Sequence, residues 1–332
     1  MDFSVLVTTK CNLSCKHCFV NKTGVDMSDT ILKQTANYIV QYYNDSLERH
    51  GSISLLGGEL GIYDLDKLID FIEYINKNCV FHYGVDIDTN LLYDLTPKHV
   101  KFFTMLNRLS TSYDPDIRFK TKEQFELWKN NLRKVSKIVP INCIICTTKQ
   151  LISYSPNEIF KRIEDIHNLG VNQFHTMLLS PTDANTSYWK YTKANNREED
   201  NWLLELYKIY KEKKPKFKLT LFDEIEQLLF KGIEFEDVCR HCMDTRRTIF
   251  PNGDISCCPF TQSKPFFNMV SGEYNINNYI YWHEKETFVP NRCKECNLFK
   301  YCKGGCCLCL HDESGCPIPK NLFNYILDSG RE

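Results

Sequence analysis

Three cysteines within eight residues, directly after a short apolar run, constrain this chain more than any other feature. The run Phe3–Val7 is typical of a buried strand. The loop after it holds Cys11, Cys15 and Cys18. A loop this tight turns three sulfurs toward one inorganic centre. Because a 4Fe–4S cluster has four irons, three cysteines leave one iron open to a small-molecule ligand. The spacing therefore indicates an iron–sulfur cluster with an open iron.

Two other interpretations of the loop remain open on spacing alone. A zinc ion prefers four ligands in a tetrahedron and is more often held by paired C-x-x-C units. A chance match is the other interpretation, because the chain has 17 cysteines in 332 residues. The spacing favours a cluster over both.

The loop resembles the signature of the radical S-adenosylmethionine (radical SAM) superfamily. The resemblance rests on C-x3-C-x2-C, with His17 before the last cysteine and Phe19 after it. It implies that the amino and carboxylate groups of S-adenosylmethionine chelate the open iron. It also implies that one electron from the cluster cleaves the sulfonium and yields a 5′-deoxyadenosyl radical, which abstracts hydrogen from a substrate. His17 and Phe19 are expected to contact the cosubstrate.

Composition excludes several classes of partner. Hydrophobic residues make up 42% and charged residues 25%, which is ordinary for a soluble globular protein. The formal net charge is −1 and no basic tract stands out, so neither nucleic acid nor an anionic membrane is implied. No apolar stretch is long enough for a signal peptide or a membrane span. We therefore expect a cytoplasmic protein whose many cysteines bind metal.

Residues 1–222 alternate strand-like and helix-like segments in six βα units. The expected strands are Phe3–Val7, 53–56, 81–88, 106–112, 141–146 and 171–179. The expected helix N-caps are Ser28, Asp64, Thr96, Thr121 and Ser155, with capping boxes at the last two, and 198–213 is a sixth helix. Such a series predicts parallel strands whose functional sites lie at their carboxyl ends. The fold class is α/β: a partial (β/α)6 radical SAM barrel over 1–222, as the resemblance implies, followed by a cysteine-rich extension over 223–332.

Three short segments after the expected strands resemble cosubstrate motifs of the family. Gly57-Gly58-Glu59 resembles its GGE motif, which implies close backbone approach to the methionyl amino group and support of that ammonium by Glu59. Thr89-Asn90 resembles its TNG segment, although Leu91 replaces the glycine. Ser112 begins a segment that resembles S-x-D-G. Ser112 is therefore the candidate ligand of the ribose, and Arg118 the candidate partner of the carboxylate.

Eleven of the cysteines lie between residues 239 and 316. The sharpest pattern is Cys293-x2-Cys296-x5-Cys302-x3-Cys306. Cys242-x10-Gly253-x4-Cys258 precedes it and Cys316 follows it. Together these resemble the seven-cysteine SPASM extension, which carries two auxiliary 4Fe–4S clusters.

The resemblance also implies a ligand set for each auxiliary cluster. The outer cluster would take Cys293, Cys296, Cys302 and Cys316. The inner one would take Cys242, Cys258 and Cys306, with Cys239 available to complete it. Neither cluster would have an open iron, so both would transfer electrons. Three ambiguities stay open: Cys257 adjoins Cys258, Cys307 and Cys309 lie near Cys306, and a two-zinc ribbon would also suit eight thiolates.

The resemblance implies a SPASM enzyme that acts on a peptide or protein side chain. Net oxidation or crosslinking is favoured, because the substrate radical must then lose an electron and auxiliary clusters offer it a path. The alternative is a dehydrogenase or epimerase of a small molecule such as a sugar or aminoglycoside, with Cys257 as the first candidate hydrogen donor. An iron–sulfur scaffold without activity is a third alternative. Pro259 after Cys258 counts against formylglycine formation, because sulfatase-maturing members often have an Asp there.

Two partners are implied beyond the substrate. An electron donor such as flavodoxin or ferredoxin must reduce the cluster. Because the barrel begins at Phe3, a leader peptide would be held by a separate leader-binding protein or by the barrel itself. The cysteines outside the motifs, Cys79, Cys143 and Cys146, lie in apolar surroundings and are expected to be core residues.

Overall fold

A computed structural model describes the chain except for residues 47–50, 82, 116, 235–240, 309–314 and 331–332. The described residues form a ten-stranded sheet in the order β10-β9-β8-β1-β2-β3-β4-β5-β6-β7. The strands are β1 (Asp2–Thr8), β2 (Ser52–Gly57), β3 (Gly84–Asp88), β4 (Arg108–Ser112), β5 (Ile141–Cys146), β6 (Gln173–Met177), β7 (Lys218–Leu219), β8 (Arg246–Ile249), β9 (Asp254–Ser256) and β10 (Phe267–Asn268). Strands β8 and β1 to β7 pair in parallel, whereas β9 and β10 continue the sheet antiparallel.

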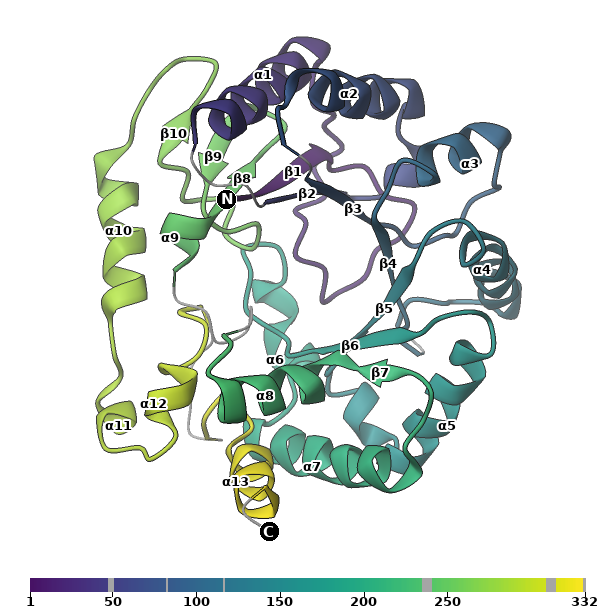
Figure 1. Cartoon of the computed structure of the whole chain (residues 1–332), viewed down its shortest axis with the longest axis vertical. Helices are drawn as coiled ribbons and strands as arrows, with labels where there is room; N and C mark the ends of the chain where they lie inside the picture. Colours follow the sequence, from purple (N-terminus) through teal and green to yellow (C-terminus); the bar gives the residue numbers. More distant parts are fainter. Residues whose placement is uncertain (47–50, 82, 116, 235–240, 309–314, 331–332) are drawn as a thin grey trace.

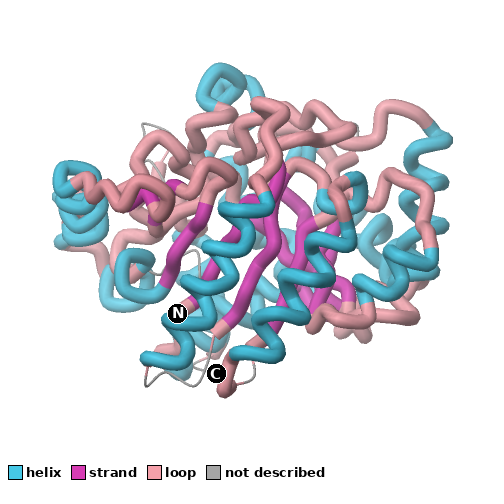
Figure 2. Tube along the Cα trace, turned by 90° about the horizontal axis from the view of Figure 1, so that it is seen from above, coloured by secondary structure: helices cyan, strands magenta, loops and turns pink. Residues whose placement is uncertain are grey.

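The sheet curves, and the helices between its strands cover the outer side (Figure 1; Figure 2 shows the strands behind them). These helices are α1 (Asp29–Asp45), α2 (Leu65–Asn78), α3 (Pro97–Phe103), α4 (Lys122–Val135), α5 (Pro156–His167), α7 (Asn196–Lys213) and α8 (Thr220–Lys231). The single-turn helix α6 (Trp189–Thr192) precedes α7. The C-terminal region adds α9 (Cys242–Thr245), α10 (Ile276–Thr287), α11 (Asn291–Lys294), α12 (Phe299–Cys302) and α13 (Lys320–Ser329). The α/β class with parallel strands is confirmed.

The five predicted N-caps all accept a backbone N–H from the first turn of their helix. The two predicted capping boxes are only half formed. Gln124 accepts the N–H of Lys120 instead of that of the cap Thr121. Glu158 pairs with Arg162 one turn along the helix. In both cases a nearby donor competes for the side chain that would close the box.

Strand β8 was not expected from the sequence. It belongs to the cysteine-rich region, yet it pairs in parallel with β1, from Asp2 opposite Arg246 to Val5 opposite Ile249. Without this pairing the backbone of β1 would present an open edge. A segment more than 200 residues away in the sequence therefore covers the edge of β1. The division at residue 222 stays a prediction, and α8 runs through that position.

The two faces of the sheet carry different side chains because successive strand residues point to opposite sides. On the outer face Phe3, Val5 and Val7 are fully buried in the main core with α1 and α2. On the concave face Leu6, Leu56 and Phe250 form a small separate cluster, on which Phe19 packs. The cysteine loop is thus seated on the concave side of β1, β2 and β8.

Among the described helices, none is at once long and apolar enough to span a bilayer.

Candidate active site

The three cysteines lie together in the loop that follows β1, and each side chain is half-buried. Backbone N–H groups point at two of the sulfurs: Leu13 N lies 3.4 Å from Cys11 Sγ, and Val20 N lies 3.4 Å from Cys18 Sγ. Burial raises the pKa of Cys15, while the cations Arg118 and Lys22 oppose the rise. Such donors and cations stabilise thiolate sulfur. At Cys15 the effect of burial outweighs that of the two cations, which offset it only in part.

The Gly57-Gly58 pair allows the end of β2 to lie directly against the cysteine loop. Gly58 N donates to Thr8 O at 2.9 Å, and Glu59 N donates to Lys10 O at 2.8 Å. A Cβ at Gly58 would lie 1.9 Å from Lys10 O and 3.0 Å from Cys11 Cβ. A side chain at that position would push the two segments apart. The glycine pair thus allows close packing of two backbone segments, and its predicted approach to the methionyl amino group stays a prediction.

Glu59 joins the ends of β2 and β3 at this edge. Its side chain is 1% exposed, and Oε1 accepts hydrogen bonds from Gly61 N at 2.8 Å and Thr89 Oγ1 at 2.5 Å. Oε2 accepts the N–H of Asn90 at 2.6 Å. Burial raises the pKa of Glu59, and these hydrogen bonds oppose the rise in part. Its predicted role toward the methionyl ammonium stays a prediction, but the carboxylate is fixed in orientation by protein donors.

The Thr89-Asn90 segment reaches the cysteine loop. Asn90 Nδ2 donates to Asn12 Oδ1 at 2.7 Å. Leu91 has φ of +55°, so it occupies the left-handed region where the resembling motif has glycine. This conformation costs a non-glycine residue about 1–2 kcal/mol. Burial of the Leu91 side chain and a hydrogen bond from Asn131 Nδ2 to its carbonyl at 3.0 Å offset that cost.

Asp114 is the site residue that the sequence analysis missed. Its side chain is 2% exposed and Oδ2 lies 3.0 Å from Arg118 Nη2 and 3.4 Å from His17 Nε2. Oδ1 lies 3.4 Å from Cys146 N. Burial alone would raise the pKa of Asp114, yet His17 and Arg118 hold it well below its usual range. The carboxylate therefore ties the cysteine loop to the ends of β4 and β5.

One signal in the sequence points to Asp114. It lies two residues after Ser112 within the recognised segment, and Arg118 follows it by four residues, the spacing at which helical side chains meet. Ser112 is at the carboxyl end of β4, as predicted. Arg118 is paired with Asp114, so its proposed contact with a carboxylate of the cosubstrate stays a prediction. Cys146 is buried, as expected of a core residue, but it lies beside His17 and Asp114 within the site.

Phe19 connects the cysteine loop to the C-terminal region. Its ring meets that of Phe260 edge-on, with centroids 5.3 Å apart. Phe260 O also accepts the N–H of Asp183, whose carboxylate accepts the N–H of Ser263 at 2.7 Å. The segment after β6 and the cysteine-rich region thus meet beside the candidate cluster loop.

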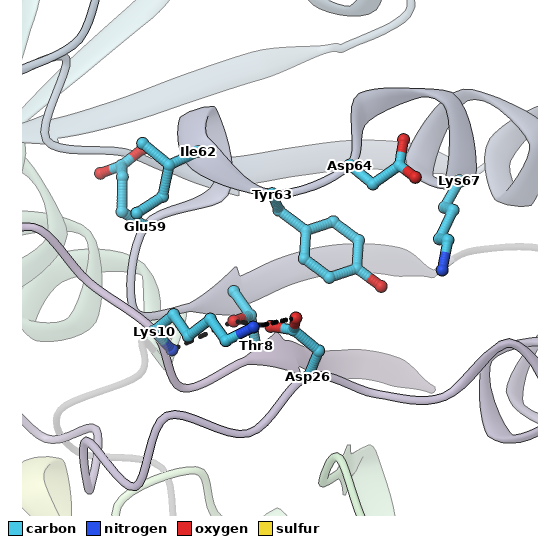
Figure 3. A pocket seen from close by; sticks show the side chains of 8 residues that line it. All are labelled: Thr8, Lys10, Asp26, Glu59, Ile62, Tyr63, Asp64 and Lys67. Carbon is cyan, nitrogen blue, oxygen red and sulfur yellow. Dashed lines mark hydrogen bonds and ion pairs between the residues drawn. The ribbon is translucent and has the colours of Figure 1, made fainter.

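A polar pocket of about 120 Å³ lies behind Glu59 (Figure 3). Its lining is Thr8, Lys10, Asp26, Glu59, Ile62, Tyr63, Asp64 and Lys67. Within this lining, the Asp26 carboxylate accepts from Lys10 Nζ and Thr8 Oγ1, each at 2.6 Å. Pockets for drug-sized ligands are about 300–1,000 Å³. This pocket is therefore too small to hold S-adenosylmethionine by itself.

The four cysteines expected at the outer auxiliary cluster lie close together. Burial raises the pKa of Cys302, and Cys296 and Cys293 add to the rise. Burial also raises the pKa of Cys316 to about 11, with Cys302 and Cys293 as neighbours. The tertiary fold brings Cys316 to the other three from a separate segment. Their role as ligands stays a prediction.

The described cysteines expected at the inner auxiliary cluster also lie close together, and Cys307 lies beside them. Burial raises the pKa of Cys258, and Cys306 and Cys242 lie beside it. Cys307 hydrogen-bonds with Cys306 and lies near Cys242 and Cys258, and both this bond and burial raise its pKa. Cys239 and Cys309 fall outside the described residues. The choice between Cys306 and Cys307 as a ligand therefore stays open.

The residues of the loop fit a three-thiolate 4Fe–4S cluster. Cys18 lies near enough to affect the pKa of both Cys11 and Cys15, so the three sulfurs share one small region. Among the described residues, His17 Nδ1 is buried without a hydrogen-bond partner. An atom of this kind suits contact with a bound polar group. His17 was predicted to contact the cosubstrate, and its orphaned nitrogen supports that prediction.

Comparisons with known proteins agree with this geometry. A family profile described as a 4Fe-4S single cluster domain matches residues 3–129. The structure of anSMEcpe with bound AdoMet is 17% identical, with a TM-score of 0.77, and the match covers 99% of this chain and 96% of that one. This chain therefore has the same fold as anSMEcpe. The α/β fold that the resemblance implies is thereby confirmed.

Two further comparisons define how far the similarity extends. The structure of anSMEcpe with AdoMet and the Cp18Cys peptide is 18% identical, with a TM-score of 0.76 and the same coverage of both chains. Over 98 residues the chain is 26% identical to the uncharacterized protein MJ0907 of Methanocaldococcus jannaschii. That match spans 29% of this chain and 32% of the curated relative. The matched 4Fe-4S profile includes the cysteine loop, Glu59, Ser112 and Arg118 of the candidate radical SAM site.

Proposed function

We propose that this chain is a radical SAM enzyme that oxidises or crosslinks a side chain of a peptide or protein. The observation that carries the proposal is the meeting of the Cys11–Cys18 loop and Gly58-Glu59 at one sheet edge, in a radical SAM fold. Support for a peptide substrate comes from anSMEcpe, which has been solved with AdoMet and the Cp18Cys peptide. Among the small-molecule alternatives, epimerisation is disfavoured because its candidate hydrogen donor Cys257 is fully buried.

When bound, a 4Fe–4S cluster with S-adenosylmethionine supplies a reducing electron and a source of the 5′-deoxyadenosyl radical. Cys11, Cys15 and Cys18 would hold the cluster. Glu59 fixes the segments that frame the cosubstrate, since it binds three donors from η1 (Leu60–Ile62) and from the residues after β3. Asp114 holds His17 and Arg118 together with its buried carboxylate. These residues orient the site and exclude water from its polar centre.

The two groups of C-terminal cysteines support net oxidation. Each would hold an auxiliary 4Fe–4S cluster with cysteine ligands at every iron, which suits electron transfer better than substrate binding. Oxidation of a substrate releases an electron after the hydrogen atom has been removed, and such clusters can accept it. Pro259 after Cys258 counts against formylglycine formation through a base at that position.

The proposal includes partners and a location that follow from the same chemistry. A low-potential donor such as flavodoxin or ferredoxin would reduce the cluster in the cytoplasm. A separate leader-binding protein would present a peptide substrate that carries a leader.

The test is anaerobic reconstitution followed by counting of iron and sulfide. We expect about twelve irons in the wild type and about eight in the Cys11→Ala/Cys15→Ala/Cys18→Ala variant. Dithionite should drive cleavage of S-adenosylmethionine to 5′-deoxyadenosine in the wild type alone. Cys79→Ala is the control. Cys79 caps α2, outside the cysteine loop and outside the two groups of C-terminal cysteines, so this variant should leave iron content and cleavage unchanged.

Three outcomes would count against parts of the proposal. Equal iron in the wild type and the triple variant would contradict a cluster in the loop. About eight irons falling to about four would mean that one auxiliary site does not form. Full iron without cleavage of S-adenosylmethionine would favour an iron–sulfur scaffold.

A further inference from the structure

Lys22 folds back over the cysteine loop, although it lies outside the C-x3-C-x2-C pattern. Its Nζ donates to the carbonyl of Leu13 at 2.7 Å. Leu13 lies midway between Cys11 and Cys15, and its side chain is buried. The Lys22 side chain is itself half-buried. The ammonium is therefore held at the loop instead of extending into solvent.

Two other cations near the loop are compensated by carboxylates. Lys10 Nζ lies 2.6 Å from Asp26 Oδ2, and Arg118 Nη2 lies 3.0 Å from Asp114 Oδ2. In the part of the chain that the structure describes, Lys22 has no carboxylate within ion-pair distance, and neither has Lys120, whose Nζ donates to Ser14 Oγ at 3.2 Å. Of these two lysines, Lys22 is half-buried at the loop, whereas Lys120 is exposed.

Leu13 links the Lys22 ammonium to a ligand sulfur. Its carbonyl accepts from Lys22 Nζ at 2.7 Å, and its N–H lies 3.4 Å from Cys11 Sγ. The Lys22 ammonium is therefore held on the peptide segment that contacts Cys11.

We propose that Lys22 raises the reduction potential of the 4Fe–4S cluster held by Cys11, Cys15 and Cys18. Reduction moves one electron from a low-potential donor onto the cluster and adds one unit of negative charge. A cation nearby stabilises the reduced state more than the oxidised state. Net charge and hydrogen bonds around a cluster are among the factors that set its potential. Lys22 would thereby allow a weaker donor to reduce the cluster, an inference that rests on the proposed function.

The test compares four single variants of the full, reconstituted chain. Lys22→Met removes the charge and the donor, and Lys22→Gln removes the charge but keeps an N–H for the Leu13 carbonyl. Lys22→Arg keeps both. Lys16→Met is the matched control, because Lys16 belongs to the same loop but its ammonium lies over the ring of Tyr188, 5.6 Å from the centroid.

Two readouts are needed for each variant, iron content and the midpoint potential from an EPR-monitored redox titration. The signal of this cluster is the one that changes when S-adenosylmethionine is added, because its open iron binds the cosubstrate. We expect wild-type iron content in all four variants. The midpoint should shift to a more negative potential in Lys22→Met and Lys22→Gln, and should stay at the wild-type value in Lys22→Arg and Lys16→Met.

The possible results separate the inference from the proposed function. An unchanged midpoint in Lys22→Gln at full iron content would overturn the inference, as would an equal shift in Lys22→Arg. If Lys22→Met and Lys22→Gln both lose iron while Lys22→Arg retains it, Lys22 holds the cluster in place and does not tune it. If the wild type shows no signal that responds to S-adenosylmethionine, the proposed function itself fails.

Discussion

Asp114 is a buried carboxylate whose two partners, Arg118 and His17, come from different parts of the chain. Arg118 lies four residues along, whereas His17 belongs to the cysteine loop. A buried charge lowers the stability of the fold unless it is paired. Removing one partner therefore leaves the other buried without a counter-charge. The pair therefore matters more for stability than any ion pair on the surface.

We predict that Asp114→Asn lowers the free energy of unfolding by about 3–5 kcal/mol, because it leaves the Arg118 guanidinium buried without a counter-charge. Urea denaturation of the apo protein at neutral pH measures this. The control is Glu158→Gln, which removes the exposed partner of Arg162 and should cost at most about 0.5 kcal/mol. Equal effects of the two variants would contradict the prediction.

The same residue predicts a pH dependence. The pKa of Asp114 is held well below that of an unfolded Asp, which is about 3.9. Its stabilising contribution is therefore fully present above about pH 4 and is lost as the pH falls through the folded pKa. The difference in unfolding free energy between wild type and Asp114→Asn should keep the same value, about that measured at neutral pH, from pH 7 down to pH 5. It should shrink below about pH 4. A difference that grew on acidification would contradict this.

Gly58 tests the contact between β2 and the cysteine loop. In Gly58→Ala the new methyl group would lie 1.9 Å from Lys10 O, so the loop must move. We expect the variant to lose about four irons per chain on reconstitution and about 1–3 kcal/mol of stability. Gly84→Ala in β3 is the control, because its Cβ would meet Asn107 only at 3.6 Å. Full iron in Gly58→Ala would show that the close approach is not required.

Single residues of the site were predictable where a motif fixes them in sequence. Cys11, Glu59 and Ser112 each follow a strand, and a parallel sheet brings the carboxyl ends of its strands to one edge. Asp114 and Lys22 were not assigned a role, because their importance depends on which side chains face them. Burial and unlike charge act through space, and neither has a fixed spacing along the chain.

At the scale of elements, α13 is held against α7 by hydrogen bonds at its N-terminus. Its first N–H groups, those of Asn321 and Leu322, donate to Asp200 on α7 at 2.8 and 3.1 Å. Leu322, Phe323 and Ile326 bury the face that α13 turns toward the core. The N-cap is thus supplied by another helix. The sequence around Pro319 gave no sign of it.

We predict that Asp200→Ala destabilises the docking of α13 by about 1–2 kcal/mol, because two N–H groups lose their acceptor. Hydrogen exchange of residues 320–329 measures the effect locally. Asp328→Ala is the control, since an acidic residue in the last turn opposes the helix dipole and its removal should not reduce protection. The prediction fails if both variants leave exchange in α13 unchanged.

Helices were easier to predict than the ends of strands. Caps such as Ser28 and Thr96 act within one turn, so their effect is visible in the local sequence. Strands β3 and β4 begin at Gly84 and Arg108, later than the apolar runs suggested, because pairing with neighbouring strands sets their limits. The two-residue strand β7 has no sequence pattern of its own and exists through its pairing with β6.

At the scale of the whole molecule, the cysteine-rich region is part of the main sheet. Strand β8 covers the edge of β1, and Phe260 packs against Phe19 of the cysteine loop. An exposed edge of a buried parallel strand promotes association with other chains. The barrel and the extension are therefore structurally interdependent, even though their sequences look distinct.

We predict that a chain ending at Gly232 forms aggregates instead of a stable monomer, because β1 then has an open edge and apolar surface under β8 is exposed. Size-exclusion chromatography and denaturant unfolding of this fragment test the prediction. The control is the full chain with Cys293→Ala and Cys296→Ala, which retains β8 and should elute at the same volume as the unmodified full chain. A monomeric fragment with cooperative unfolding would contradict the prediction.

The sequence by itself determined the βα alternation, the helix caps and the three-cysteine loop, because these depend on residues within one turn or one loop of each other. It also determined that a second group of cysteines, between residues 239 and 316, follows the βα units. Only the tertiary structure decided that β8 lies beside β1, that Cys316 joins Cys293 and Cys302, and that Asp114 and Lys22 face the cysteine loop. Those contacts join segments far apart in the chain. They are set by the packing of the whole sheet and by the need of buried charges to find partners, which no local pattern records.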